Sequence, residues 1–329
     1  LQYKVLIMKK ILIFLCSILI FSCQEQVVEL EIPGHTPFLV VNGILDTDSI
    51  MSLHVSNSVG AFQQGQISSI SDANVLLYEN NNLLGEMSVD FNTQDSIYIL
   101  EQSGYWWGAN QLEPIYYYTY NGFPQVGSTY SVEVSHPNFE SVSAETTVPQ
   151  EIELSELEIL DNSDLSETYV STLNLSFFDD PNESNYYRIS LYVHTSAEVE
   201  DEEGDNETIK KSYPLILYSN DPSFSQGIPW DGYSFSGRRV FFSDDLFNGT
   251  QKEISFDFEY KVDTEMNDSI FLQLTSFSEE AFNYYNSMES NDDSFFSEIG
   301  TEPVPIYTNV ENGAGVFASG KSIYFQVIP

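Results

Sequence analysis

The feature that most constrains this chain is a long stretch without cations: no lysine or arginine occurs between Cys23 and Arg188. The 329 residues include 50 acidic and 11 basic side chains, for a formal net charge of −39. We therefore expect that salt bridges do not hold the first half together, and that apolar burial and backbone ladders must do so. The carboxylates of this half repel one another, and dissolved salt should screen them.

The same charge excludes two kinds of partner surface. Nucleic-acid binding needs a basic face, and adsorption to anionic lipids through protein charge needs clustered lysines and arginines. The 3 Trp, 21 Tyr and 23 Phe residues are too many for a disordered acidic tail and indicate a folded, aromatic-rich protein.

The N-terminus has the pattern of a secretory signal. Met8, Lys9 and Lys10 precede an apolar run from Ile11 to Phe21, which is shorter than the ~20 residues that a membrane-spanning helix needs. We predict a signal peptide over residues 1–22, with residues 1–7 upstream of an uncertain start. The alternative is that residues 1–7 form a genuine N-terminal extension.

The signal ends at Ser22, directly before Cys23, and this resembles a bacterial lipobox. We therefore expect Cys23 to be diacylated, with palmitate-like chains, and to lead into a tether over residues 23–36. Two or three acyl chains anchor a protein stably. Cys16 would leave with the signal, so no disulfide is expected. The alternative is an ordinary signal peptide that is cleaved near a cysteine by coincidence.

From Pro37 onward the pattern is one of short strands and turns, typical of β-sandwiches. The predicted fold class is mainly β, with two β-sandwich-like domains: an Ig-like N-terminal domain over residues 37–149 and a C-terminal β-rich domain over 150–329. The strands predicted in the first domain are Phe38–Leu45, Met51–Val55, Ala73–Tyr78, Ser96–Leu100, Gly127–Val134 and Ser141–Val148.

The second domain continues the β pattern and adds one short helix near the C-terminus. The helix is expected to start after Ser278 as N-cap, with Glu279 and Glu280 in its first turn, and to end at 291–293. An acidic stretch at 151–167 has weak periodicity, and Glu198–Glu207 is expected to be a solvated loop. The strands predicted here are Thr172–Phe178, Tyr186–His194, Tyr213–Tyr218, Arg238–Phe242, Lys252–Val262, Ser269–Phe277, Val304–Tyr307, Gly313–Ala318 and Ile323–Val327.

No motif for catalysis is present, and the chain has no P-loop, nucleophile elbow or dinucleotide fingerprint. The four histidines lack metal-ligand spacing, so we expect no cofactor and no enzymatic activity. One compact acidic group, Asp179, Asp180 and Asn182, is a candidate calcium site between two strands. The alternative is a turn whose carboxylates are solvated.

Aromatic residues gather before the last hairpin of the first domain. Alternate residues of a strand point to opposite faces, so consecutive aromatic residues cannot all enter one core. Some are therefore candidate contacts for a ligand or a protein partner; the alternative is internal packing. The candidates are Tyr105, Trp106, Trp107, Tyr116, Tyr118 and Tyr120, with the loop residue Trp230 as a weaker one.

Several short segments run through the mature chain in a defined order and spacing. They are Phe38–Gly43, Asp72–Tyr78, Asp180-Pro181, Asn185–Ile189, Phe242–Gly249, Glu302–Val310 and Gly313–Phe317. In these segments the chain resembles the Bacteroidota outer-membrane lipoproteins grouped as domain of unknown function 4249. The resemblance brings no catalytic residue, and Gly313 and Gly315 are expected to serve the backbone rather than a ligand.

What the resemblance implies is a lipid-anchored outer-membrane protein, on the periplasmic or the cell-surface face. Such proteins are often encoded beside TonB-dependent transporters, which suggests a non-enzymatic accessory or ligand-capturing partner of a transporter. The alternatives are a surface adhesin or glycan-binding module that acts without a transporter, and a hydrolase with an unrecognised site.

Overall fold

The computed structural model describes residues 34–60, 68–91, 96–99, 111–161, 170–200, 206–224, 232–260, 267–294 and 305–328. Pro37–Val59 and Gly65–Pro329 form one compact unit. Leu1–Thr36 and Gly60–Gln64 form a second unit, which lies almost entirely outside the described residues. The predicted signal peptide and Cys23 therefore lie outside them as well.

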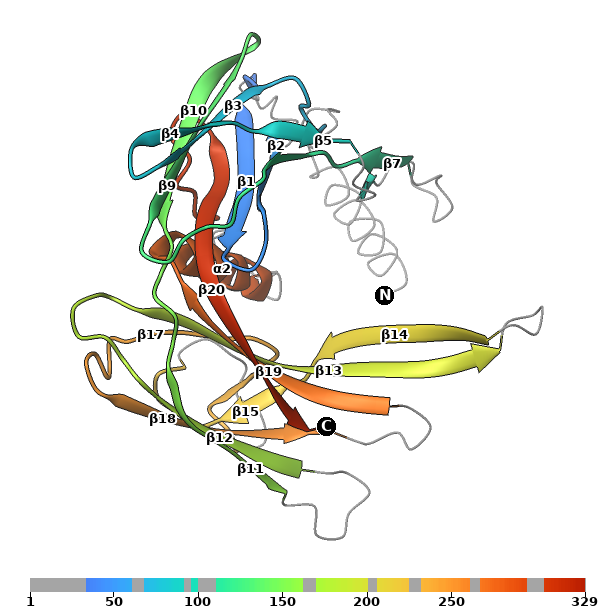
Figure 1. Cartoon of the computed structure of the whole chain (residues 1–329), viewed down its shortest axis with the longest axis vertical. Coiled ribbons are helices and arrows are strands. Elements are labelled where there is room, and N and C mark those ends of the chain that lie inside the picture. Colours follow the sequence, from blue (N-terminus) through green and yellow to red (C-terminus); the bar gives the residue numbers. More distant parts are fainter. Residues whose placement is uncertain are drawn as a thin grey trace, which may run out of the picture. The chain divides into compact units, whose positions relative to one another are not determined.

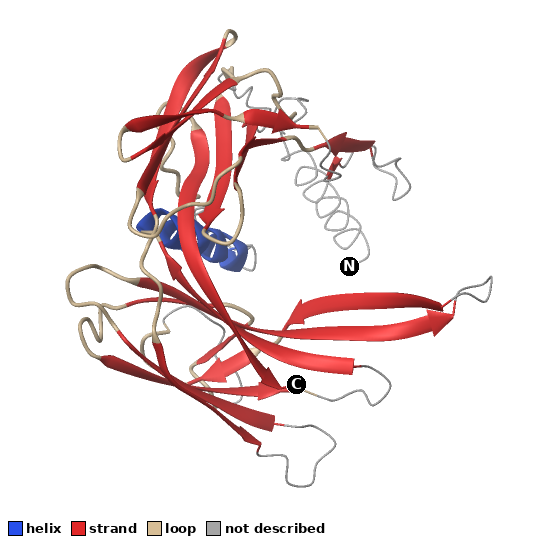
Figure 2. Ribbon diagram, in the orientation of Figure 1, coloured by secondary structure: helices blue, strands red, loops and turns tan. Residues whose placement is uncertain are grey.

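The expected fold class is confirmed, because the described residues form strands in several sheets with one helix (Figure 2). The largest sheet has nine strands, and β17 (Val240–Ser243) pairs with β13 beside the main path. In spatial order the path is β14 (Asn206–Pro214), β13 (Tyr186–Glu200), β19 (Asn267–Phe277), β20 (Ala314–Ile328), β1 (Leu39–Asp46), β2 (Met51–Asn57), β8 (Tyr117–Tyr120) and β5 (Ser88–Asp90).

The first hydrophobic core lies between part of this sheet and a four-stranded sheet. Alternation in β1 buries Leu39, Val41 and Leu45, as a strand with one face on the core requires. They share a core with residues such as Val75, Leu77, Val132 and Val134. The four-stranded sheet comprises β10 (Phe139–Thr147), β9 (Thr129–His136), β3 (Asn74–Glu79) and β4 (Asn82–Glu86).

The second core is rich in aromatic rings. Phe224 stacks on Phe256 with ring centroids 5.2 Å apart, and Phe177 lies 4.9 Å from Tyr187. Each fully buried phenylalanine contributes roughly 1.5–3 kcal/mol. One side of this core is covered by a five-stranded sheet. Its strands are β11 (Leu154–Asp161), β12 (Val170–Phe178), β18 (Gln251–Glu259), β15 (Leu217–Ser219) and β16 (Phe235–Gly237). A separate hairpin joins β6 (Ser96–Ile99) and β7 (Gln111–Pro114).

Strand β20 belongs to both cores (Figure 1). Its first half runs parallel to β1 from Val40↔Ala314 to Asp46↔Gly320, and its second half pairs antiparallel with β19. Phe317 is buried in the first core, whereas Ile323 and Phe325 pack against the second. The boundary predicted at residue 149 falls between the two cores in sequence, but the last strand completes both.

The predicted helix is present as α2 (Glu279–Ser294), and its start is confirmed. The hydroxyl of Ser278 accepts a hydrogen bond from the Ala281 amide at 3.3 Å, as an N-cap does. Phe282 and Tyr285 pack against a cluster that includes Phe241 and Phe277. In the part of the chain that the structure describes, no helix is long and apolar enough to cross a membrane.

Several local expectations were wrong. The predicted loop at Glu198–Glu207 is strand at both of its ends, because β13 extends to Glu200 and β14 starts at Asn206, while 201–205 lie outside the described residues. Cross-strand pairing extends this hairpin in spite of its charge, since charged side chains are tolerated where a strand faces solvent. The acidic stretch at 151–167 contains β11, and Pro305–Tyr307 is not a strand. The two strands predicted at 313–318 and 323–327 are one continuous strand, β20.

Replacement of Gly315 by alanine should strongly destabilise the protein. Gly315 pairs with Val41 at a φ of +101°, and an added Cβ would lie 2.1 Å from the Val41 carbonyl oxygen. We expect a loss of about 3 kcal/mol or more in the free energy of unfolding, measured by chemical denaturation. Gly34→Ala is the matched control, because nothing lies within 4 Å of its added Cβ. Equal stability of the two variants would contradict the close approach of Gly315 to Val41.

Candidate functional site

The aromatic residues predicted as contacts fall in and beside β8, and the structure separates them. Tyr116 lies just before the strand, half-buried, and its ring meets Phe91 edge to face with centroids 5.3 Å apart. Phe91 directly follows β5 and is 64% exposed. These two rings, of which Phe91 is exposed and Tyr116 half-buried, form an aromatic pair that we name the Phe91–Tyr116 pair.

The other two described candidates, Tyr118 and Tyr120, pack against the protein, Tyr118 completely and Tyr120 in part. Tyr118 is only 1% exposed; its hydroxyl donates to the Ile70 carbonyl at 3.0 Å and accepts from the Ala73 amide at 2.9 Å. Burial raises the pKa of Tyr118. Tyr120 is half-buried, and its hydroxyl donates to the Leu84 carbonyl at 3.4 Å. Tyr118 is thus a core residue and offers no surface to a partner.

The remaining candidates, Tyr105, Trp106, Trp107 and Trp230, lie outside the described residues, as does Cys23. They stay predictions.

The position of the Phe91–Tyr116 pair gives it a second property. Strand β5 ends the path of the nine-stranded sheet, where it pairs with β8 from Ser88↔Thr119 to Asp90↔Tyr117. An edge strand presents backbone groups that can pair with another chain. An aromatic pair with one exposed ring beside such an edge combines the two features that protein interfaces use most.

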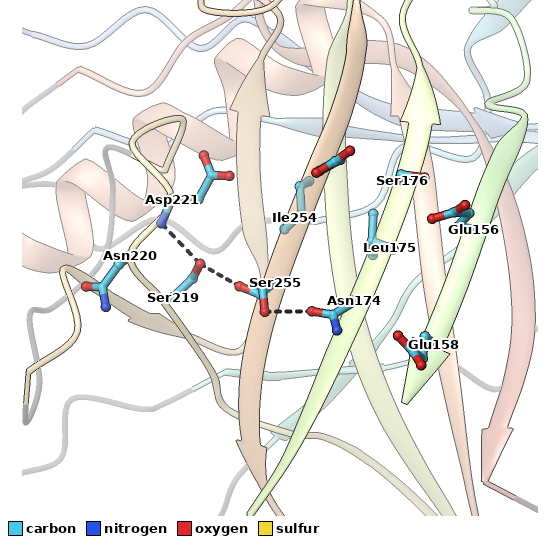
Figure 3. Close-up of a pocket in the computed structure, with 11 residues that line it drawn as sticks. Glu156, Glu158, Asn174, Leu175, Ser176, Ser219, Asn220, Asp221, Ile254 and Ser255 are labelled. Carbon is cyan, nitrogen blue, oxygen red and sulfur yellow. Dashed lines mark hydrogen bonds between the residues drawn. The ribbon is translucent and has the colours of Figure 1, made fainter. Parts of the chain in front are cut away.

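A second candidate is a polar hollow of about 440 Å³ on the outer face of the five-stranded sheet (Figure 3). The register places Glu156 opposite Ser176, and Glu158 opposite Asn174, so all four side chains share this face. Glu253 and Ser255 of β18 continue it. None of the residues that line the hollow is aromatic, and its carboxylate, amide and hydroxyl groups can hydrogen-bond a ligand.

Hydrogen bonds fix the floor and the rim of this hollow. Ser255 donates to the amide oxygen of Asn174 at 2.8 Å, and Ser219 donates to the Ser255 carbonyl at 2.8 Å. Behind the rim, Lys252 forms a largely buried ion pair with Asp221 at 2.7 Å. This pair holds the rim loop, and removal of one partner would leave a buried uncompensated charge.

The structure gives the predicted calcium group a different role. Asp179 is fully buried; its carboxylate accepts from the Tyr187 hydroxyl at 2.5 Å and from the Gly249 amide at 2.7 Å. Asp180 is exposed and instead accepts two hydrogen bonds from Asn182. Within the described ranges, no group of three or more His, Cys, Asp or Glu residues is placed to hold a metal ion.

Desolvation raises the pKa of Asp179, and its hydrogen bonds from Tyr187 and Gly249 oppose this effect. The carboxylate ties the end of β12 to β13 and to the loop before β18. It is a structural centre of the second core.

Sequence reasoning did not find Phe91 or the hollow. Phe91 is a single aromatic residue after a three-residue strand, and only its pairing with Tyr116 across the fold makes it notable. The hollow draws residues from β11, β12 and β18 and from the loop at 219–221, which are far apart in the sequence. The sheet register that joins them has no local signal.

The family model of a domain of unknown function (DUF4249) matches residues 25–322. The chain belongs to this family. The match extends over nearly all of the β structure described above, so both cores are part of the family's domain. No curated protein sequence matches the chain.

Among solved structures, the chain is similar to the C-terminal globular domain of an oligosaccharyltransferase from Pyrococcus abyssi. The identity is 11% and the TM-score 0.15, over 67% of this chain and 43% of that one. The chain thus spans less than half of that structure's length. A similarity this weak carries no argument about fold or function.

Replacement of Tyr187 by phenylalanine should raise the pKa of Asp179 further, because it removes a hydrogen bond that favours the ionised carboxylate. The folded pKa already lies above the ordinary 3.8. The contribution of Asp179 to stability is therefore present below pH 3.8 and is lost as the pH rises through the folded pKa. The free energy of unfolding of the variant should be lower than that of the wild type by about 1–3 kcal/mol.

The measurement is a titration of the Asp179 carboxyl carbon by NMR, combined with denaturation at several pH values. Tyr78→Phe is the control, because its hydroxyl donates to an exposed partner, Glu133, at 3.0 Å. A wild-type pKa below 3.8 at Asp179 would contradict the conclusion that burial dominates the pKa of this carboxyl group.

Proposed function

We propose that this chain is an exported lipoprotein, anchored to the outer membrane through Cys23, that acts as a non-enzymatic accessory or ligand-capturing partner of a TonB-dependent transporter. The observation that carries the proposal is the Phe91–Tyr116 pair, with its exposed Phe91 ring, beside the edge strand β5. Exposed aromatic rings are the commonest anchors of protein interfaces.

The N-terminal sequence supports the anchoring part of the proposal. The family match begins at residue 25, directly after the predicted lipidation site. A lipid anchor confines a protein to two dimensions and so raises its effective concentration near a membrane partner. A modest contact through a small aromatic patch then suffices to keep the two proteins together.

The buried Asp179 is not placed to act as a catalytic acid. Asp179 is the described carboxyl group whose pKa is clearly raised, and both of its oxygens are held by the fold. Catalytic acids with raised pKa values usually face a cleft. Asp179 instead faces a packed core.

Loss of the aromatic pair should weaken the partnership. We expect Phe91→Ser combined with Tyr116→Ser to reduce the recovered transporter about fivefold or more, because interface anchors contribute about 1–2 kcal/mol each. The measurement is affinity purification of the tagged lipoprotein from detergent-solubilised outer membranes of its native host.

Phe178→Ser is the matched control, because Phe178 is 61% exposed and lies on β12, away from β5. Equal recovery with both variants would show that the aromatic pair is not the contact. Recovery of the lipoprotein alone, with the transporter present in the membrane, would overturn the accessory role.

A second candidate function is glycan binding without a transporter, and the polar hollow favours it. Carboxylate, amide and hydroxyl groups on one face can hydrogen-bond the hydroxyl groups of a sugar. The hollow ranks second because none of its lining residues offers a ring on which a sugar could stack.

The two functions predict different outcomes for one variant. Glu158→Gln with Asn174→Ala removes the charge of one side chain and the amide of the other from the hollow and should leave transporter recovery unchanged. If the hollow binds glycans, a glycan array should show binding by the wild type and at least about tenfold weaker binding by this variant. Glu133→Gln is the control, because Glu133 lies on β9, in the other sheet.

A further inference from the structure

One face of the nine-stranded sheet carries an unusual row of polar side chains. The register places Arg188 of β13 opposite Thr275 of β19, and Ser190 opposite Gln273. Thr275 and Gln273 lie opposite Ser322 and Tyr324 of β20. Directly paired residues share a face, so these six side chains lie together on the side of the sheet that faces away from the second core.

Arg188 is the exceptional member of this row. Its guanidinium donates to the Thr275 hydroxyl through Nη2 at 3.3 Å and lies over the Phe277 ring at 4.9 Å. Its Nε atom is buried and has no hydrogen-bond partner. No carboxylate of the described residues forms an ion pair with Arg188, although the sequence has 50 acidic residues.

The two described lysines with little exposed side-chain surface show what is normal in this protein. Lys252 pairs with Asp221 at 2.7 Å, and Lys321 pairs with Asp48 at 3.1 Å. A buried charge without a partner costs several kcal/mol. Among the described residues, Arg188 offsets this cost with one side-chain hydrogen bond and one aromatic contact.

Ser190 provides an independent observation. It has no exposed surface, and its hydroxyl oxygen has no hydrogen-bond partner. Arg188 Nε and Ser190 Oγ are the two buried side-chain polar atoms without a partner in the described part of the chain. They lie two residues apart on one strand and on one face, so a single polar group placed between them would satisfy both.

Among the described residues, the surroundings of this point are fixed by hydrogen bonds, and no carboxylate pairs with Arg188. Gln273 donates to Tyr324 at 2.8 Å and to Ser322 at 3.2 Å, and Ser322 bonds to Thr275 at 3.0 Å. Burial lowers the pKa of Arg188 most, and the nearby charge of Arg239 lowers it further. Two neighbouring cations without a carboxylate form a local positive field.

We propose that Arg188 and Ser190 form the base of a binding site for the carboxylate group of a small organic acid, with Arg239 at its entrance. A planar carboxylate matches the edge of a guanidinium and can accept from Nε and from the serine hydroxyl. Arg239 and Tyr324 are exposed, and both lie close enough to Arg188 to influence its pKa, so we place the entrance of the site on their side. The site does not depend on the transporter proposed above.

The overall charge selects a small monoanion. The net charge of −39 repels a polyanion wherever salt does not screen the interaction. A single carboxylate is repelled less and is attracted by the two nearby arginines. A dianion such as phosphate experiences twice the long-range repulsion.

The test measures the unfolding midpoint of the purified full-length protein with sodium acetate and, separately, sodium benzoate. Sodium chloride at equal ionic strength corrects for general screening, and sodium phosphate runs in parallel. A saturating carboxylate should raise the midpoint by about 2 °C or more beyond chloride. Arg188→Gln should abolish this rise, and Arg239→Gln should reduce it.

Arg238→Gln is the matched control, because Arg238 is exposed, and it should keep the full carboxylate response. Should Arg188→Gln fail to fold, Ser190→Ala tests the same site, with the affinity for benzoate measured by ligand-observed NMR and expected to fall about tenfold. Equal responses of the wild type and Arg188→Gln would overturn the proposal, as would a response to phosphate alone. No response to any probe would also overturn it and leave bound water as the partner of the two atoms.

Discussion

The pairing of β20 with two different strands is the constraint on which the rest of the structure depends. Its first half supplies a parallel neighbour to β1, and its second half an antiparallel neighbour to β19. A parallel pair needs a long connection, and here nearly the whole domain forms it. The close approach at Gly315 shows how little freedom this pairing leaves, because only a residue without a side chain fits against Val41.

Tyrosine hydroxyls donate hydrogen bonds to some of the carboxylates that have no lysine or arginine partner. Tyr130 donates to Glu79 at 2.6 Å, which together with burial raises the pKa of the tyrosine to about 12, and Tyr78 donates to Glu133 at 3.0 Å. Lys321 of β20 adds the cation that the first half of the sequence lacks, since it pairs with Asp48. The expectation that this half has no salt bridges was wrong at Asp48, because the distant strand β20 supplies Lys321, which local sequence could not show.

The sequence predicts the strands whose alternation is clear, such as β1, β2 and β12, because one buried face imposes a period of two. The N-cap of α2 was equally predictable, since Ser278 followed by two glutamates is a local signal. The length of β20 was not, because Gly320 and Lys321 interrupt its apolar pattern while cross-strand contacts carry it through. The unpartnered atoms of Arg188 and Ser190, and the aromatic pair of Phe91 and Tyr116, arise only from tertiary pairing, about which local composition says nothing.

The order of the strands has a consequence for how the chain acquires its fold. The first core contains Val310 and Phe317. One edge of β1 stays unpaired until residues 314–320 of β20 are in place beside it. A growing or translocating chain must therefore hold the incomplete first sheet, with one side of β1 unpaired, until its last strand emerges. Contacts of such long sequence separation form slowly, and an unpaired strand is prone to wrong association in that interval. The many carboxylates of this half give the incomplete intermediate the mutual repulsion that keeps such chains apart.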